Sequence, residues 1–158
     1  EGVVAVLPVV ICFQSLILDM AGNVGTQSLA VTIRVLMDEN LNGKDKLKLL
    51  FKEMKVGCCN GALLGVLALV CLGVYIALFK GYAIGTAFLI SGCVGISLLT
   101  AIIISSLVGT LVPIIFHKIN VDPAVASGRL ITTVNDLVAV VTYYGLAWIL
   151  LIRMMKIV

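Results

Sequence analysis

Four stretches of about twenty apolar residues dominate this chain of 158 residues and limit what it can fold into. About twenty helical residues span the hydrocarbon core of a bilayer. The composition agrees, because 61% of the residues are hydrophobic and 12% are charged, whereas a soluble domain has roughly 45–50% apolar and about 25% charged residues. These numbers exclude a soluble enzyme or nucleic-acid-binding protein. They predict an all-α integral membrane protein, a multi-pass bundle of helices in the lipid bilayer of the cell membrane.

The predicted bundle is a single domain over residues 1–158, with spans at about 3–37, 56–79, 83–116 and 123–152. The first is too long for one crossing, and we expect the segment 19–28 (DMAGNVGTQS) to interrupt it, since its glycines permit a bend. Pro113 is expected to end or kink the third span. Asp122 is expected to cap the fourth span. The GxxxG spacing of Gly57, Gly61 and Gly65 predicts a helix-packing face.

An amphipathic link at 44–55 precedes the second span. Its lysines fall on one helical face and its large apolar residues on another: Lys44, Lys48, Lys52 and Lys55 against Leu47, Leu50, Phe51 and Met54. This pattern is typical of a helix that lies in the membrane interface.

The cationic residues are distributed unevenly between the two ends of the predicted spans. One side has Arg34, Lys44, Lys46, Lys48, Lys52, Lys55, Lys118 and Arg129, and the other has Lys80, Arg153 and Lys156. The positive-inside rule therefore places the connections 34–55 and 117–129 in the cytoplasm and both ends of the chain outside. An outer end that opens directly into an apolar helix predicts at least one further helix upstream, a fifth in total.

The chain offers no pattern that supports an enzyme. The five cysteines lie in apolar runs without metal-binding spacing, and we interpret them as small buried hydrophobic residues: Cys12, Cys58, Cys59, Cys71 and Cys93. No Ser-His-Asp arrangement can be assembled around the one histidine, His117, which is expected at a membrane boundary.

Two acids, Asp19 and Asp136, lie in the interior of predicted spans. A carboxylate at the bilayer centre costs roughly 2.5–3.5 kcal/mol on insertion scales, so such residues face a bundle interior or a water-filled path. Either could be a hydrogen-bonded structural aspartate. Because no lysine or arginine lies at the same depth, the alternative is a bound cation as the counter-charge.

Small and polar residues accompany Asp136. Gly128, Thr132 and Asp136 recur every four positions and share one stripe of the helix. We expect this stripe to bind a metal ion together with Asp19, and the pore lining to include Asn23, Asn135 and Thr133. Hard oxygen ligands suit Mg²⁺ or Ca²⁺. One carboxylate is a poor site for a divalent ion, which predicts two copies of the chain across a two-fold axis.

The segments DMAGNVGTQS, DPAVASG and ITTVND, together with the basic link, resemble the transmembrane domain of MgtE-type magnesium channels, to which eukaryotic solute-carrier magnesium transporters are related. The resemblance covers nearly the whole chain in order and spacing. It implies a five-helix homodimeric domain whose pore is lined by the first and fourth spans. Hydrated Mg²⁺ would be held by the Asp136 carboxylate, with the backbone carbonyl of Thr132 one turn earlier. Typical members also carry cytosolic N-terminal and CBS domains.

We therefore expect a channel or transporter domain that passes largely hydrated Mg²⁺, with Mn²⁺, Co²⁺ and Ca²⁺ as open alternatives. Two other functions stay open at this point. One is a membrane scaffold or accessory subunit whose acids hold helices together. The other is a proton-coupled carrier that uses Asp19 and Asp136 as a relay.

Overall fold

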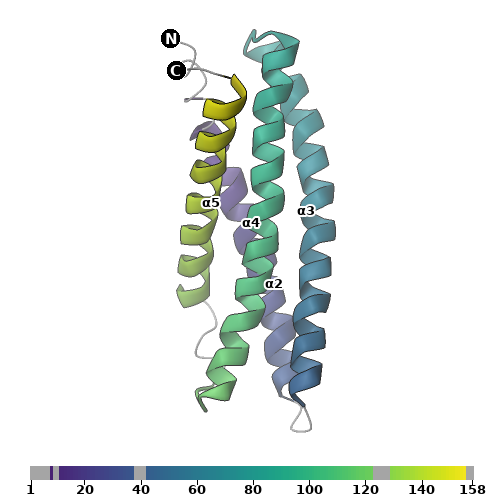
Figure 1. The fold of residues 1–158 in the computed structure, drawn as a ribbon, viewed down its shortest axis with the longest axis vertical. Helices are drawn as coiled ribbons and strands as arrows, with labels where there is room; N and C mark the ends of the chain where they lie inside the picture. The colour runs from purple at the N-terminus through teal and green to yellow at the C-terminus, as the bar shows by residue number, and fades with distance from the viewer. Residues whose placement is uncertain (1–7, 9–10, 38–41, 123–128, 156–158) are drawn as a thin grey trace.

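A computed structural model describes residues 8, 11–37, 42–122 and 129–155, and the side chains of 129, 130 and 150–155 are not described. The described part contains four helices and no strand: α2 (Gln14–Leu36), α3 (Gly43–Phe79), α4 (Ile84–Lys118) and α5 (Arg129–Met155). They lie along one another as an elongated bundle (Figure 1). The predicted all-α fold is confirmed. By length and composition, α3 and α4 can each cross a membrane.

Helix α2 runs without a break through the segment that was expected to interrupt it, so this prediction was wrong. Gly25 serves close packing and does not bend the helix. Gly25 is buried, and a Cβ there would collide with the side chains of Asn135 and Ser105. A Cβ on Gly109 of α4 would likewise collide with the backbone carbonyl of Gly25. The two glycines therefore allow α2 and α4 to approach backbone to backbone.

Helix α3 contains both the basic link and the second predicted span in 37 residues. The amphipathic link at 44–55 therefore leads directly into the span within one helix. No proline and no turn separates the link from the span, so the hydrogen-bond ladder continues. At 1.5 Å per residue the helix is about 55 Å long, which exceeds a hydrocarbon core of about 30 Å. One end of α3 must therefore extend beyond the apolar layer.

The predicted GxxxG face is confirmed, because Gly57, Gly61 and Gly65 are all buried. A Cβ on Gly61 would lie 3.1 Å from the carbonyl oxygen of Leu99, and a Cβ on Gly95 would lie 2.7 Å from that of Gly65. Small residues on both partners thus let α3 and α4 pack at backbone distance.

Helix α4 is the central helix, in contact with α2, α3 and α5. It continues through Pro113 to Lys118, so the proline does not end the helix. Hydroxyl groups in its interior donate to neighbouring carbonyls: Ser105 Oγ to Ala21 O at 2.5 Å and Ser106 Oγ to Glu53 O at 2.9 Å. These bonds tie α4 to α2 and α3. Asp122 was expected to cap a helix that begins near residue 123, and residues 123–128 lie outside the described part of the chain.

The cysteines differ from expectation. All five are free thiols, but only Cys93 is buried, and Cys12, Cys58, Cys59 and Cys71 are exposed on the outside of the bundle. Apolar sequence does not distinguish inside from outside in a membrane bundle, because its outer surface is also apolar.

The turn between α3 and α4 is formed by Lys80 and Gly81, whose φ of 69° favours glycine.

Candidate functional site

A polar groove of about 500 Å³ lies between α2 and α5. The lining residues from α2 are Ser15, Leu18, Asp19, Gly22, Asn23 and Thr26, and those from α5 are Thr132 and Asp136. Four residues predicted from sequence therefore lie around one space: Asp19, Asn23, Thr132 and Asp136. We refer to it as the polar groove.

On the α2 side, Asp19 and Asn23 are consecutive along one face of the helix. Asn23 Nδ2 donates to Asp19 Oδ2 at 3.3 Å, and both side chains are exposed. One turn further on, Thr26 Oγ1 is within hydrogen-bonding distance of the carbonyl oxygens of Gly22 (3.0 Å) and Asn23 (2.9 Å). This helix thus presents a carboxylate, an amide and a hydroxyl to the groove.

On the α5 side, Thr132 and Asp136 are one turn apart and both line the groove. Asp136 is exposed. Its Oδ1 lies 3.9 Å from the position that a Cβ on Gly22 would occupy. Gly22 therefore leaves space beside the Asp136 carboxylate, and a larger side chain there would take it up.

Two other predicted residues, Asn135 and Thr133, lie outside the groove lining. Asn135 is fully buried and sits behind the groove, next to Gly25 and Ser105. Within the described part of the chain, neither its Oδ1 nor its Nδ2 has a hydrogen-bond partner. Thr133 is exposed but does not line the groove. Gly128 lies outside the described residues.

Sequence reasoning missed Ser15, Gly22 and Thr26 as lining residues. A signal for them exists, because Ser15, Asp19, Gly22 and Thr26 recur at intervals of three or four residues in an otherwise apolar helix. That is the same helical-stripe argument that identified Thr132 and Asp136 on α5.

The donor set of the polar groove consists of oxygen atoms, with two carboxylates from one chain. The described residues contain no cluster of three or more His, Cys, Asp or Glu side chains that could enclose a metal ion. A dry, fully coordinated site for a transition metal is therefore not found in this part of the chain. Two carboxylates with hydroxyl and amide groups suit a hard cation that keeps most of its water, as Mg²⁺ commonly does. Asp19 lines the groove together with Asp136, so one chain brings two carboxylates to it.

These features define a helical membrane domain with a polar, acidic groove between two helices. The profile of the MgtE family, described as "Divalent cation transporter", matches residues 14–146. The chain belongs to this family, as its motifs suggested.

Named relatives agree with the family match. A magnesium transporter MgtE of Bacillus subtilis is 41% identical over 85% of the chain. Those of Enterococcus faecalis and Thermus thermophilus are 35% and 29% identical over 93% and 96% of it. The matched region is 28% of the Bacillus subtilis protein, 30% of the Enterococcus faecalis protein and 31% of the Thermus thermophilus protein. The chain thus spans less than a third of these relatives.

Proposed function

We propose that this chain forms the ion-conducting membrane domain of a Mg²⁺ transporter, and that hydrated Mg²⁺ passes along the polar groove. The observation that carries the proposal is that Asp19 and Asp136 line the same groove from different helices. No ion pair to either acid is found among the described residues, so a divalent cation can serve as their counter-charge. The names of the relatives, all magnesium transporters, favour Mg²⁺ over Mn²⁺, Co²⁺ and Ca²⁺.

The exposure of the two acids supports a homodimer. Asp19 and Asp136 both lie on the outside of the single bundle. Facing lipid there, each carboxylate would cost roughly 2.5–3.5 kcal/mol or more. A second copy placed against the groove across a two-fold axis would replace lipid by a second polar wall. The groove would then become a closed pore with four carboxylates.

The groove residues suit an ion that retains its water. Mg²⁺ requires octahedral geometry at about 2.0–2.1 Å and dehydrates reluctantly. The groove offers space beside Gly22 and short polar side chains, with no compact ligand cage. We therefore assign Asp136 and Asp19 to outer-sphere contacts with the waters of the ion. Thr132, Thr26 and Asn23 would accept or donate hydrogen bonds to the same water shell.

The domain arrangement belongs to the same proposal. Residues 1–158 form one transmembrane domain in which α2 and α5 cross the membrane beside α3 and α4. The cation distribution orients the end with the α2–α3 and α4–α5 connections toward the cytoplasm of a cell membrane. Ion movement down the electrochemical gradient requires no covalent step, so we assign transport and not enzymatic catalysis. Cytosolic regulatory domains, as the resemblance implies, would lie outside this sequence.

The test is Mg²⁺ flux into liposomes that contain the full-length protein. Asp136→Asn keeps the side-chain shape and removes the charge, and we expect at least about a hundredfold loss of flux, since a lost charge contact of about 3 kcal/mol corresponds to that factor. Asp45→Asn, which removes an acid outside the groove, is the matched control and should leave flux within twofold.

Two outcomes would contradict the proposal. Unchanged Mg²⁺ flux in a folded Asp136→Asn protein would remove the groove from the ion path. A wild-type flux that stops when the proton gradient is collapsed, at constant membrane potential, would instead support the carrier in which the two acids relay protons. Absence of any flux with an intact dimer would favour the scaffold.

A further inference from the structure

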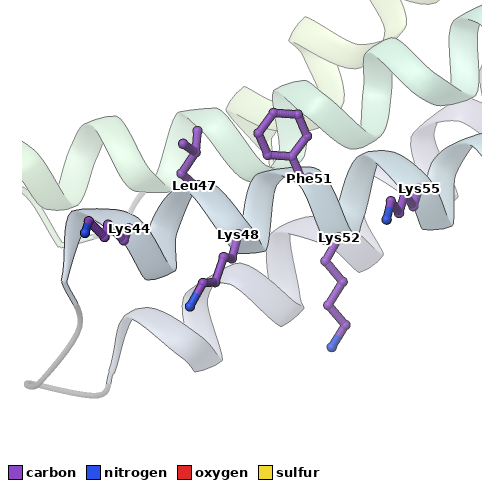
Figure 2. Close-up of a pocket in the computed structure, with 6 residues that line it drawn as sticks. All are labelled: Lys44, Leu47, Lys48, Phe51, Lys52 and Lys55. Carbon is purple, nitrogen blue, oxygen red and sulfur yellow. The ribbon is translucent and has the colours of Figure 1, made fainter.

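The cytoplasmic end of α3 carries a basic and apolar surface that no other described helix covers. It is formed by Lys44, Leu47, Lys48, Phe51, Lys52 and Lys55, which line a shallow hollow of about 500 Å³. Figure 2 shows these side chains extending from one stretch of the helix. We refer to it as the lysine–phenylalanine surface.

The large apolar residues of this surface are not buried by the bundle. Leu47 is 55% exposed and Phe51 is 52% exposed. Both lie at the end of α3 that the proposed orientation puts on the cytoplasmic side. Around them, Lys48 pairs with Asp45 at 3.4 Å, an ion pair whose lysine side chain is 80% exposed and therefore weak. Exposed apolar side chains among lysines match a partner that combines negative charge with hydrocarbon.

The continuity of α3 fixes the depth of each lysine. If the outer edge of the hydrocarbon core lies at Phe79, about twenty residues of helix bring its inner edge near Cys59. Lys55 is then about 6 Å below that edge and Lys52 about 10 Å, which is within reach of the headgroup layer for a long side chain. Lys48 and Lys44 lie about 16 and 22 Å below it, which is about two and nearly three Debye lengths of about 8 Å.

We propose that the membrane-proximal part of the lysine–phenylalanine surface, formed by Phe51, Lys52 and Lys55, binds anionic phospholipid headgroups of the cytoplasmic leaflet. Lys52 and Lys55 would donate to the phosphate oxygens, and Phe51 would pack against the headgroups from the aqueous side. The cytoplasmic leaflet is negatively charged, and basic clusters next to a membrane helix are attracted to it. The inference rests on the orientation proposed above and not on which ion is transported.

The alternative occupant is an acidic segment of a cytosolic protein or domain. Such a segment would approach from the aqueous side and would engage the far lysines, Lys44 and Lys48, at least as strongly as the near ones. The lipid proposal predicts the opposite order along the helix. The change in each lysine's contribution to binding, from Lys55 to Lys44, therefore distinguishes the two occupants.

The experiment measures binding of short-chain phosphatidylglycerol and, separately, short-chain phosphatidylcholine to the detergent-solubilised full-length protein. We expect the double variant Lys52→Gln/Lys55→Gln to weaken phosphatidylglycerol binding about tenfold or more and to leave phosphatidylcholine binding unchanged. Lys44→Gln and Lys118→Gln, which make the same charge change at the same end of the bundle, should each change it by less than twofold. Phe51→Ala should weaken the binding of both lipids.

Melting temperature in the same detergent shows that each variant is folded. Equal loss with Lys44→Gln and with Lys55→Gln would overturn the proposal. So would unchanged phosphatidylglycerol binding in the double variant. Tighter binding of an acidic oligoglutamate peptide than of phosphatidylglycerol, lost with Lys44→Gln, would assign the surface to a protein partner. None of these outcomes depends on Mg²⁺ flux, so failure here leaves the transport proposal to its own test.

Discussion

The contact between α3 and α4 and the groove between α2 and α5 use small residues in opposite ways. In the first, Gly65 and Gly95 bring two backbones together and leave no space between them. In the second, Gly22 leaves space beside the Asp136 carboxylate, and polar side chains line it. Both pairs of helices are apolar overall, and each has a glycine at the place compared here. The difference teaches that glycine content alone does not separate a packing contact from a path for ions; the polar residues beside the glycine do.

The largest expected effect comes from adding one methyl group to the α3–α4 contact. In Gly95→Ala the new Cβ would lie 2.7 Å from the Gly65 carbonyl oxygen, so the backbones must separate. We expect destabilisation of about 1–3 kcal/mol, measured as a lower melting temperature in detergent. Gly92→Ala is the control on the same helix. Its Cβ would meet only Leu69 Cδ1 at 3.6 Å, and alanine favours the helix, so stability should be equal or higher.

Equal melting temperatures for the Gly95 and Gly92 variants would show that the α3–α4 contact is looser than the structure has it. In that case the α3–α4 contact would no longer differ from the groove in leaving no space between its helices.

A smaller effect, on transport and not on folding, is expected for Gly22→Val. The added methyl groups would enter the space next to Asp136 Oδ1 and displace the hydrated ion or the carboxylate. A penalty of about 1–2 kcal/mol would lower Mg²⁺ flux roughly tenfold. Flux into liposomes and melting temperature are measured together, with Gly22→Ala as the milder control. A large drop in melting temperature, with flux per folded protein unchanged, would mean that Gly22 is a packing glycine like Gly95.

The smallest effect is expected for Asn135→Leu. Among the described residues the Asn135 amide has no hydrogen-bond partner, so an apolar side chain of similar size should cost little or raise stability by up to about 1 kcal/mol. Because Asn135 is buried behind the groove, we expect flux within about threefold of wild type. A flux loss as large as that of Asp136→Asn would place Asn135 in the ion path after all.

Much of the fold could be predicted from the sequence, because apolar length and glycine spacing are local signals. The all-α class and the packing face at Gly57, Gly61 and Gly65 follow from them directly. Breaks in a helix were predicted less well. The glycines of α2 and Pro113 of α4 lie inside continuous helices. For Gly25 a tertiary contact decides the outcome, because this glycine lets the backbone of α4 approach at Gly109 and does not bend the helix.

The candidate site was predicted in part for a similar reason. The stripe containing Thr132 and Asp136 is visible within one helix, and both residues line the groove. The meeting of Asp136 with Asp19 depends on how α2 and α5 pack, which periodicity within one helix cannot give. The side to which Asn135 points is also a packing result, because one position along a helix turns a side chain by about 100°.

The backbone contact between α3 and α4 also restricts motion. Moving Leu69 of α3 into the place of Gly65, or Leu99 of α4 into the place of Gly95, would force the two backbones apart, so this contact resists relative motion of the two helices. We expect α3 and α4 to move together as one rigid unit when the protein changes conformation. We then expect α2 and α5 to make the displacement that opens or narrows the groove. Distances between paired spin labels on these two helices would measure it.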